Sequence, residues 1–562
     1  MDTTTFAAAN GAVVGTPVPP TRRTVLDGAH IGDIRGALGT LRAHGRAPRT
    51  RRHRLLALLA VMGPGLIVMV GDNDAGGVAT YAQAGQNYHL TLLWTLVLLV
   101  PVLIVNQEMV VRLGAVTGVG HARLIIERFG KFWGAFSVGD LFILNFLTIV
   151  TEFIGVSLAL GYFGVSRYLA VPIAALLLIA MTTTGSFRKW ERFMFVFVAT
   201  NFIAVPLALL SHPHLGPIVT GSVAPGVEGG FNSTSMLLII GIVGTTVAPW
   251  QLFFQQSNVI DKRITPRWIN YERADTVIGS LIVVLGAAAL MIAVSFGLGS
   301  TRLHGQFSDA GAVARGLSAH VSPLAGDLFA IALLNAAVIG AAAVTLASSY
   351  AFGDVCRRPH SLHHGLGTAN LFHGSYAVMV ALAAAIVLIP GAPLGTITIA
   401  VQALAGVLLP SATVFLLLLC NDKAVLGPWT NSGWLNMVAS AIVGVLVMLS
   451  AILTATVLFP HIDVALLTVV QFGALAAGLA AGGVYLARGR IFSLRVPAGG
   501  RMPRAPRPPR IVREHWTMPQ LELLERPAWS RIRKLGMITL RGYLVIAVLM
   551  LIIKAVEVGI GH

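Results

Sequence analysis

GDNDAGG, residues 71–77, lies in the middle of an otherwise apolar segment. Residues 55–70 carry no charged side chain, and residues 78–84 carry none either. A carboxylate at the centre of a membrane helix costs about 2.5–3.5 kcal/mol on insertion scales. Two carboxylates, Asp72 and Asp74, flanked by three glycines that weaken a helix, therefore need a functional reason. The usual reason is a cation, and the alternative is a glycine-packed helix crossing whose carboxylates face a basic partner.

The composition of the whole chain places this segment in a membrane. Hydrophobic residues make up 55% of the 562 residues, charged residues only 11%, and the mean hydropathy is +0.78. Soluble domains carry about 25% charged residues, and a membrane span needs about 20 apolar ones. Stretches of that length lie near 55–84, 90–111, 135–164, 168–185, 193–211, 235–258, 275–298, 324–350, 372–390, 394–420, 434–459 and 463–487, with another near 537–557. We therefore predict an all-α polytopic membrane protein with about 12–13 transmembrane helices.

The net charge of +17 is distributed as a topology signal. If the N-terminus is cytoplasmic, Lys and Arg gather in every second turn, as at 188–192 and 262–273. The intervening turns at 85–89, 212–233 and 460–462 have none. This alternation satisfies the positive-inside rule. It predicts a multi-pass protein of a bacterial cytoplasmic (inner) membrane, and it removes the need for a nucleic-acid partner.

The domain organisation follows from the positions of the apolar stretches. We expect a basic, disordered cytoplasmic tail at 1–54, a transmembrane domain at 55–487, a basic Pro/Arg-rich linker at 488–534 and an extra hydrophobic helix at 535–562. Within the transmembrane domain we expect two repeats, near 55–211 and 235–420, and accessory helices at 434–487. The basic tails are expected to contact anionic lipid. We expect no cofactor and no obligatory protein partner.

A second interruption falls in the sixth apolar stretch. Residues 241–251 read GIVGTTVAPWQ, and Pro249 removes a backbone donor well inside an apolar run. Thr245, Thr246 and Gln251 place neutral oxygens beside it. A proline in a membrane helix is often only a kink. Together with the broken first span, however, it predicts two five-helix repeats in inverted orientation, a 5+5 transporter fold with broken helices 1 and 6.

Several segments between residues 55 and 459 resemble the Nramp family of divalent-metal transporters. The similarity lies in Gly63-Pro64-Gly65 and Asp74-Ala75-Gly76-Gly77 (the family's GPG and DPGN), Arg112-Leu113-Gly114 with Thr117-Gly118, Thr151-Glu152-Phe153-Ile154-Gly155, Arg188-Lys189-Trp190-Glu191, Ala248-Pro249-Trp250 (the family's MPH), Gln402 with Leu409-Pro410, and Asn421-Asp422-Lys423 with Asn431. The order and spacing of these motifs are specific, although no single motif is. The resemblance implies an alternating-access transporter of divalent metal ions and no enzymatic activity.

The departures from the family pattern concern the metal ligands. The resemblance implies ligands from the DPGN Asp and Asn, the MPH Met and a carbonyl one turn before that Met. In this chain the Asp remains as Asp74, the Asn is replaced by Gly77, the Met is replaced by Ala248, and the carbonyl position is Thr245. Thioether sulfur favours transition metals, whereas oxygen ligands suit magnesium, calcium and manganese. The pattern is similar to the branch described as Nramp-related magnesium transporters, with a roomy site for a partly hydrated ion.

We expect Asp74 to be the principal metal ligand, either directly or through ordered water. Asp72 either ligates the ion or contributes only its charge at the rim of the site. Thr245 and Gln251 would offer neutral oxygens, and Gln402 is either a further ligand or a packing amide.

The groups that the resemblance assigns to proton movement are missing. The two histidines of the family's sixth helix are Trp250 and Gln255 here, and the aspartate one turn before Glu152 is Ile149. None of the three replacements exchanges a proton near neutral pH. Glu152 remains as an accessory ionisable residue. We therefore expect transport of Mg²⁺ or Mn²⁺ without proton coupling.

Two other transport functions stay open. One is proton-coupled import of Mn²⁺ or Fe²⁺, because manganese also accepts oxygen ligands. The other is sodium-coupled uptake of an organic solute on the same fold, against which the two unpaired carboxylates argue. A histidine-rich turn at 360–373 is either a weak metal site or a solvated loop.

Overall fold

The computed structural model describes most of the chain: residues 30–43, 50–458, 462–495 and 509–524, with the single residues 538, 542 and 545. Apart from those three single residues, the extra helix expected near 537–557 lies outside the described part of the chain, as do residues 496–508 and 525–534 of the expected linker. Conclusions about the fold therefore concern the part of the chain that contains the twelve other expected spans.

The described chain is almost wholly helical. Its first part contains α1 (Arg51–Val61), α2 (Pro64–Val70), α3 (Ala75–Tyr88), α4 (Leu93–Thr117), α5 (His121–Phe129), α6 (Lys131–Tyr162), α7 (Arg167–Thr182), α8 (Phe187–Thr200), the 3-10 helix η3 (Asn201–Ile203), α9 (Ala204–Leu210) and α10 (Leu215–Val223). Its second part contains α11 (Ser233–Thr246), α12 (Pro249–Asp261), η4 (Pro266–Trp268), α13 (Ile269–Leu298), α14 (Ala310–His320), α15 (Pro323–Cys356), α16 (Asn370–Val387), α17 (Leu394–Cys420), α18 (Lys423–Leu426) and η5 (Gly427–Trp429). The last described elements are α19 (Gly433–Leu458), α20 (Val464–Arg495), α21 (Arg510–His515) and η6 (Leu521–Leu523).

These helices coincide with the twelve expected spans. Within the described residues, 9 helices are long and apolar enough to cross a membrane, or up to 10 if α1 and α2, which meet at a bend of 53°, form one span. Shorter apolar helices lie at Arg167–Thr182 and Leu466–Ala481. The prediction of an all-α polytopic membrane protein is confirmed.

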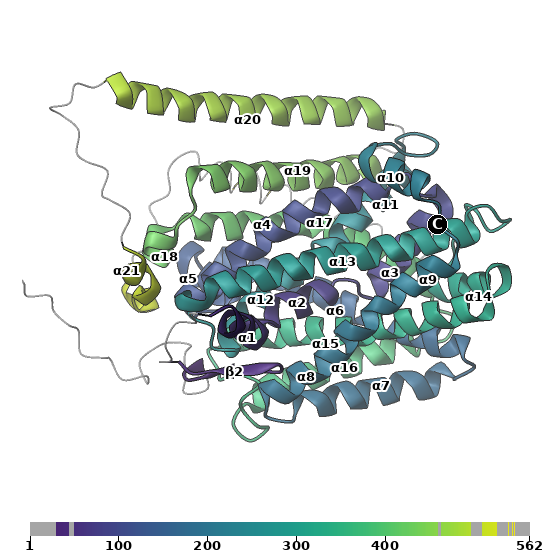
Figure 1. Ribbon diagram of the computed structural model, residues 1–562, viewed down its shortest axis with the longest axis horizontal. Coiled ribbons are helices and arrows are strands. Elements are labelled where there is room, and N and C mark those ends of the chain that lie inside the picture. The colour runs from purple at the N-terminus through teal and green to yellow at the C-terminus, as the bar shows by residue number, and fades with distance from the viewer. Residues whose placement is uncertain are drawn as a thin grey trace, which may run out of the picture.

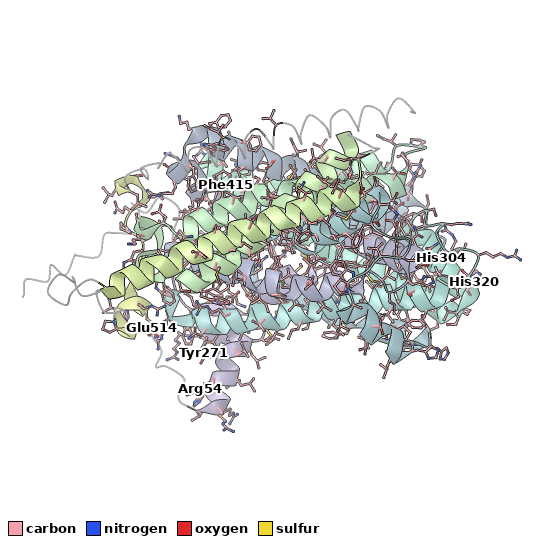
Figure 2. The ribbon with its side chains drawn as sticks, turned by 90° about the horizontal axis from the view of Figure 1, so that it is seen from above. Arg54, Tyr271, His304, His320, Phe415 and Glu514 are labelled. Carbon is pink, nitrogen blue, oxygen red and sulfur yellow. The ribbon has the colours of Figure 1, made fainter. Side chains whose placement is uncertain are left out.

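The long helices lie side by side and define two ends of the molecule (Figure 1). One end, here called the basic end, holds α1, α5, α18 and α21 and includes an ion pair of 2.6 Å between Arg128 and Asp422. Arg54, Tyr271 and Glu514 lie toward the basic end, whereas His304 and His320 lie at the opposite one, here called the far end (Figure 2).

Burial separates lipid-facing helices from central ones. Within their most apolar windows, 28% of the residues of Phe187–Leu210 are buried, against 94% of those of Ser233–Asp261. Large apolar side chains on peripheral helices are exposed, as expected for contact with lipid tails; Leu176 of α7 is 68% exposed. The broken sixth span is therefore enclosed by protein, which irregular backbone at membrane depth requires.

The first turn of α2 is held by the carboxylate of Asp275, a residue of α13. Gly63 adopts φ 155°, which favours glycine, and its N–H donates to Asp275 Oδ2 at 3.0 Å. The N–H groups of Gly65 and Leu66 donate to the same oxygen at 2.8 and 3.3 Å. These are the unpaired donors of the first turn of α2, and a negative charge there also opposes the helix dipole.

One part of the expected N-terminal tail is ordered. Residues 1–29 lie outside the described part of the chain, but β1 (Ile34–Gly36) and β2 (Gly39–Leu41) form an antiparallel hairpin that packs on α1. Between the strands, the N–H of Ala37 donates to Glu191 of α8. The expectation of a disordered tail at 1–54 is therefore wrong for this segment, because a buried carboxylate far along the chain holds its turn.

Candidate functional site

The first span breaks between α2 and α3, at residues 71–74. Asp74 is 2% exposed and precedes α3 in extended backbone, and its Oδ1 accepts from the N–H of Gly77 at 2.7 Å. Glu152 of α6 accepts from the N–H of Ala75 through its Oε2 at 3.1 Å. Two carboxylates thus meet the positive end of α3, where the helix dipole favours them.

The sixth span breaks between α11 and α12, at Val247 and Ala248. Ala248 has extended backbone (φ −80°, ψ 145°), is 5% exposed and precedes Pro249, the first residue of α12. Its methyl group offers no hydrogen bond to the helix end that follows. This second break contributes no charge, in contrast to the first.

Oxygens from both breaks crowd the position beside Gly77 where a side chain would begin. A Cβ placed on Gly77 would lie 2.9 Å from Thr245 Oγ1, 3.2 Å from the carbonyl oxygen of Asp72 and 3.4 Å from Asp74 Oδ1. The Thr245 hydroxyl is buried and has no hydrogen-bond partner among the described residues. A carboxylate, a backbone carbonyl and a hydroxyl that face one small space are ligands of the kind that hard divalent cations take.

Asp72 is held by a chain of amides. Gln251 of α12 donates its Nε2 to Asp72 Oδ1, and Gln107 of α4 donates its Nε2 to Gln251 Oε1 at 3.0 Å. Gln251 therefore presents its nitrogen to the site and uses its oxygen elsewhere, which differs from the neutral oxygen expected of it. The second oxygen of Asp72 is buried without a partner among the described residues. Gln107 was not anticipated, because a single glutamine in an apolar helix carries no pattern.

No recorded ion pair between described residues includes the acids of the site. Asp72, Asp74 and Glu152 are 0–2% exposed, and the ion pairs of the described chain join other residues. Burying a carboxylate without a compensating charge is costly. Their hydrogen-bond donors are backbone N–H groups and an amide, which compensate only in part. The arrangement therefore favours an added cation over a helix crossing with a basic partner.

Gln402 lies beside the site. The space that a Cβ on Gly76 would need is occupied by the amide of Gln402, which α17 brings against α3. Its Nε2 has no hydrogen-bond partner among the described residues. Gln402 therefore contacts Gly76, the residue before Gly77, where the oxygens of Asp74 and Thr245 converge. This placement is compatible with both expected roles of Gln402, metal ligand and packing amide.

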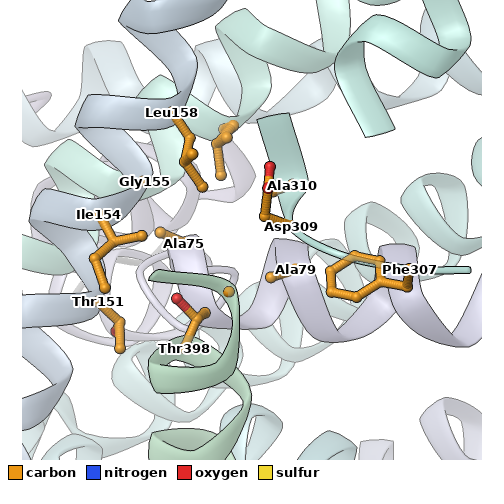
Figure 3. A pocket seen from close by; sticks show the side chains of 12 residues that line it. Ala75, Ala79, Thr151, Ile154, Gly155, Leu158, Phe307, Asp309, Ala310 and Thr398 are labelled. Atoms are coloured by element: carbon orange, nitrogen blue, oxygen red, sulfur yellow. The ribbon is translucent and has the colours of Figure 1, made fainter. Parts of the chain in front are cut away.

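Two cavities lie near the breaks. The first is lined by Ala75, Ala79, Gly155, Phe307 and Asp309 among others (Figure 3). The second is lined by residues of α6, α12 and α17, including Pro249. Neither cavity is lined by Asp72 or Asp74. The cavities therefore adjoin the breaks through Ala75 and Pro249 and do not reach the two aspartates.

The positions assigned to proton movement by resemblance are filled by groups that do not titrate near neutral pH. Ile149 and Trp250 are buried, and Gln255 donates its Nε2 to Thr276 at 3.1 Å. Glu152 is the ionisable residue among these positions, and one of its oxygens is already committed to Ala75. Its geometry is that of a group that caps α3.

A second group of buried charges, between the site and the basic end, was missed by sequence reasoning. Lys262 and Glu191 form a fully buried ion pair at 2.5 Å, and Lys262 also donates to the carbonyl of Met62 at 2.7 Å. Glu272 of α13 is fully buried, and neither of its oxygens has a hydrogen-bond partner among the described residues. Glu272 falls in the basic turn expected at 262–273, and Asp275 is the first residue of the span expected at 275–298, so neither position marks a buried group.

The histidine-rich turn is occupied by internal contacts. His360 pairs with Asp354 at 3.2 Å, and His363 Nε2 lies 3.1 Å from the carbonyl oxygen of Asp261. Burial lowers the pKa of His360, but the hydrogen bond and charge of Asp354 outweigh burial, so its pKa is raised above 6.5. His373 Nε2 lies 3.0 Å from the carbonyl oxygen of His364. These side chains tie the turn to α12 and α15. The expectation of a solvated loop is therefore wrong for His360 and His373, which are 8% and 3% exposed, because they are held by internal contacts.

Comparison with known proteins finds relatives over most of the described helices. Residues 65–456 match the model of the natural resistance-associated macrophage protein-like (Nramp) family. The chain is 26% identical over 423 residues to the divalent metal cation transporter MntH of Staphylococcus aureus, and 29% identical over 430 residues to that of Pediococcus pentosaceus. Each match covers 70% of this chain and 90% of the relative.

A solved structure shares the fold. The crystal structure of the Eremococcus coleocola manganese transporter, in complex with an aromatic bis-isothiourea substituted compound, superimposes with a TM-score of 0.58 at 21% identity. The match covers 79% of this chain and 97% of the other. The prediction of an inverted-repeat transporter fold is thus confirmed. Because the family model spans most of the described helices, the chain belongs to the Nramp family.

Proposed function

We propose that the protein is a secondary transporter that moves a divalent cation, Mg²⁺ or Mn²⁺, across the cytoplasmic membrane by alternating access and without coupled protons. The observation that carries this proposal is the convergence of Asp74 Oδ1, the Asp72 carbonyl oxygen and Thr245 Oγ1 on the space beside Gly77. One cavity adjoins the first break at Ala75, and another adjoins the second break at Pro249. The transported ion is the missing positive charge of the buried acids.

The ligand set favours a hard cation over a soft one. Residues 71–77 and 245–251 contain no Met or Cys, so neither break offers a sulfur ligand. Mg²⁺ keeps several waters and is bound through one or two carboxylates, whereas sulfur ligands select softer metals. Gly77 offers no side-chain ligand at the first break, which suits an ion that keeps part of its water. Mg²⁺ is therefore the first candidate and Mn²⁺ the second.

Transport without protons is supported by the groups around the site. Trp250, Gln255 and Ile149 cannot carry a proton, and Glu152 is held by the N–H of Ala75. A divalent ion that moves inward gains about 2.3 kcal/mol per charge per 100 mV of membrane potential. Entry therefore needs no second driving ion.

Proton-coupled manganese import is the second candidate, and one specific observation favours it. The relatives named above are divalent metal cation transporters, and the structural neighbour is a manganese transporter. Oxygen ligands also accept Mn²⁺. In this alternative the fully buried Glu272, whose oxygens lack partners among the described residues, would be available to carry the proton.

Uptake into proteoliposomes separates the candidates. The full-length protein would be tested with Mg²⁺, Mn²⁺, Ca²⁺ and Zn²⁺ between pH 6 and 8, with a pH-sensitive dye inside the vesicles. We expect uptake of Mg²⁺ or Mn²⁺ that follows an imposed membrane potential and leaves the internal pH unchanged. Acidification of the lumen in step with metal entry would establish the proton-coupled alternative instead.

A further inference from the structure

A second cluster of metal-binding side chains lies at the far end of the molecule, where Figure 2 labels His304. His89 Nδ1 lies 2.6 Å from Glu228 Oε2, and His304 Nε2 lies 4.0 Å from Glu228 Oε1. The two imidazole rings stack with centroids 4.6 Å apart. One donor atom from each of the three residues lies within 4.8 Å of the others. We call these three residues the outer triad.

The outer triad joins three segments that are distant in sequence. His89 follows the last residue of α3 and has φ 50°, Glu228 lies between α10 and α11, and His304 lies between α13 and α14. Two of these segments adjoin a broken span, because α3 is the second half of the first one and α11 is the first half of the sixth.

Hydrogen bonds outside the triad hold its segments in place. His89 Nε2 lies 3.1 Å from the carbonyl oxygen of Gly299, and the N–H of Glu228 donates to Thr91 Oγ1 at 3.2 Å. Gln86 of α3 donates its Nε2 to the carbonyl of Leu303 at 2.6 Å, next to His304. Such supporting contacts orient metal ligands before an ion arrives. The cluster is therefore positioned by the fold as well as by its own side chains.

The chemistry of the triad differs from that of the transport site. Two imidazoles and one carboxylate form a ligand set that Zn²⁺ takes with a water as fourth ligand, whereas Mg²⁺ prefers oxygen ligands. Bonds of about 2.0–2.2 Å in a tetrahedron place neighbouring ligand atoms about 3.4 Å apart. The observed separations of 2.6 and 4.0 Å bracket that value. The side chains of His89, Glu228 and His304 are 37–43% exposed, so an ion can reach them from solvent.

We propose that the outer triad binds one transition-metal ion of the Zn²⁺ class, at a site separate from the transport site, and that the bound ion restrains the far end. Such an ion ties the end of α3 to the connections that precede α11 and α14. Alternating access requires these segments to move relative to one another. Occupation of the triad from the far side therefore slows transport without competing for Asp74.

Titration calorimetry on the full-length protein tests the binding independently of transport. Zn²⁺ is added to the Asp74→Ala protein, which removes the principal ligand of the transport site. We expect one Zn²⁺ per chain, which excess Mg²⁺ does not displace. When His304→Ala is combined with Asp74→Ala, the affinity for Zn²⁺ should fall at least about 100-fold, because loss of an outer-shell partner of a metal ligand alone lowers metal affinity 10–100-fold. Glu228→Gln, which preserves the side-chain shape, should weaken it as well.

His320→Ala is the matched control, since His320 lies at the same end and bonds within its own helix to the carbonyl of Gly316. Zn²⁺ binding should survive in this variant. Unchanged Zn²⁺ binding in both His304→Ala and Glu228→Gln would overturn the proposal, as would displacement by Mg²⁺. Because calorimetry needs no transport, these results stand whether or not the proposed transport function does.

Uptake measurements test the restraint. Micromolar Zn²⁺ added on the far side should slow Mg²⁺ or Mn²⁺ uptake by the parent and by His320→Ala, and should leave His304→Ala unaffected. Equal inhibition of the parent and His304→Ala would refute the regulatory role.

Discussion

Both broken spans start a new helix inside the protein, but different groups lie at the two helix starts. At the first break the new helix, α3, begins beneath two carboxylates, Asp74 and Glu152. At the second break Ala248 precedes Pro249, the first residue of α12, and neither supplies a charge or a side-chain cap. In the proposed function, the first break provides the negative charge that attracts a cation. The second provides the hydroxyl of Thr245.

This difference explains why the two halves of the site are not equivalent. A buried carboxylate costs free energy unless a charge compensates it, so the acids of the first break support the proposed cation site. The methyl group of Ala248 at the second break costs little to bury. In the proposed function, affinity for the cation therefore comes from the carboxylates of the first break, and selectivity comes from the lack of a sulfur ligand at the second.

Removal of the charge at the first break should have the largest effect. Asp74→Ala deletes the carboxylate that faces the Gly77 space and also caps α3. We expect metal uptake into proteoliposomes to fall at least about 100-fold, because even indirect metal partners contribute 10–100-fold. Asp327→Asn is the control. Asp327 accepts a 3.0 Å hydrogen bond from the Tyr162 hydroxyl and belongs to neither break. Normal transport by Asp74→Ala would show that the site lies elsewhere.

Filling the space between the breaks should have the next largest effect. In Gly77→Ala the new methyl carbon would lie 2.9 Å from Thr245 Oγ1 and would occupy the point where three oxygens meet. Overpacking of this kind costs about 1–3 kcal/mol, so we expect a loss of uptake of about tenfold. Gly241→Ala in α11 is the matched control, because its methyl would meet only Thr80 Cγ2 at 3.7 Å. Equal uptake by the two variants would contradict the convergence of oxygens at Gly77.

A sulfur at the second break should change selectivity more than rate. Ala248→Met restores the soft ligand that the family pattern has there. We expect the ratio of Mn²⁺ to Mg²⁺ uptake to rise by about threefold or more, because thioether sulfur favours transition metals. Ala248→Leu adds similar volume without sulfur and should leave that ratio unchanged. If both variants shift the ratio equally, the second break acts through volume and not through ligand softness.

The sequence was sufficient for the elements that depend on composition. The apolar stretches predicted the described spans, and the glycines of 71–77 and Pro249 predicted the two breaks. Asp74, Thr245 and Gly77 could be placed together because the two breaks had to face each other across the repeat. The family resemblance showed which residues of the two breaks correspond to the family's metal ligands. The residue types showed that the first break carries charge and that the second is neutral.

The contacts that tertiary packing decides could not be obtained in this way. Gln107 orients Gln251, and Asp275 caps α2, although neither position has a pattern that marks it. The hairpin at 34–41 is held by Glu191, more than 150 positions away, within a tail whose composition resembles that of a disordered segment. Each of these depends on a single long-range partner, and local sequence carries no record of it.

Neutralisation of the second carboxylate at the first break should have the smallest effect and tests its role most directly. Glu152→Gln keeps an oxygen that can accept the N–H of Ala75, so the cap on α3 survives while the charge is lost. If Glu152 serves α3 and not a proton, uptake should change by no more than about threefold, a barrier change below 1 kcal/mol, and should stay independent of pH between 6 and 8. Glu152→Ala, which removes the acceptor too, should lower the thermal stability of the detergent-solubilised protein more than Glu152→Gln does.

A parent that acidifies the vesicle lumen during metal entry, together with a Glu152→Gln variant that does not, would make Glu152 a proton carrier. In that case the first break would hold both the cation ligand and the coupling group, and the contrast between the two breaks would be greater than the cap alone implies.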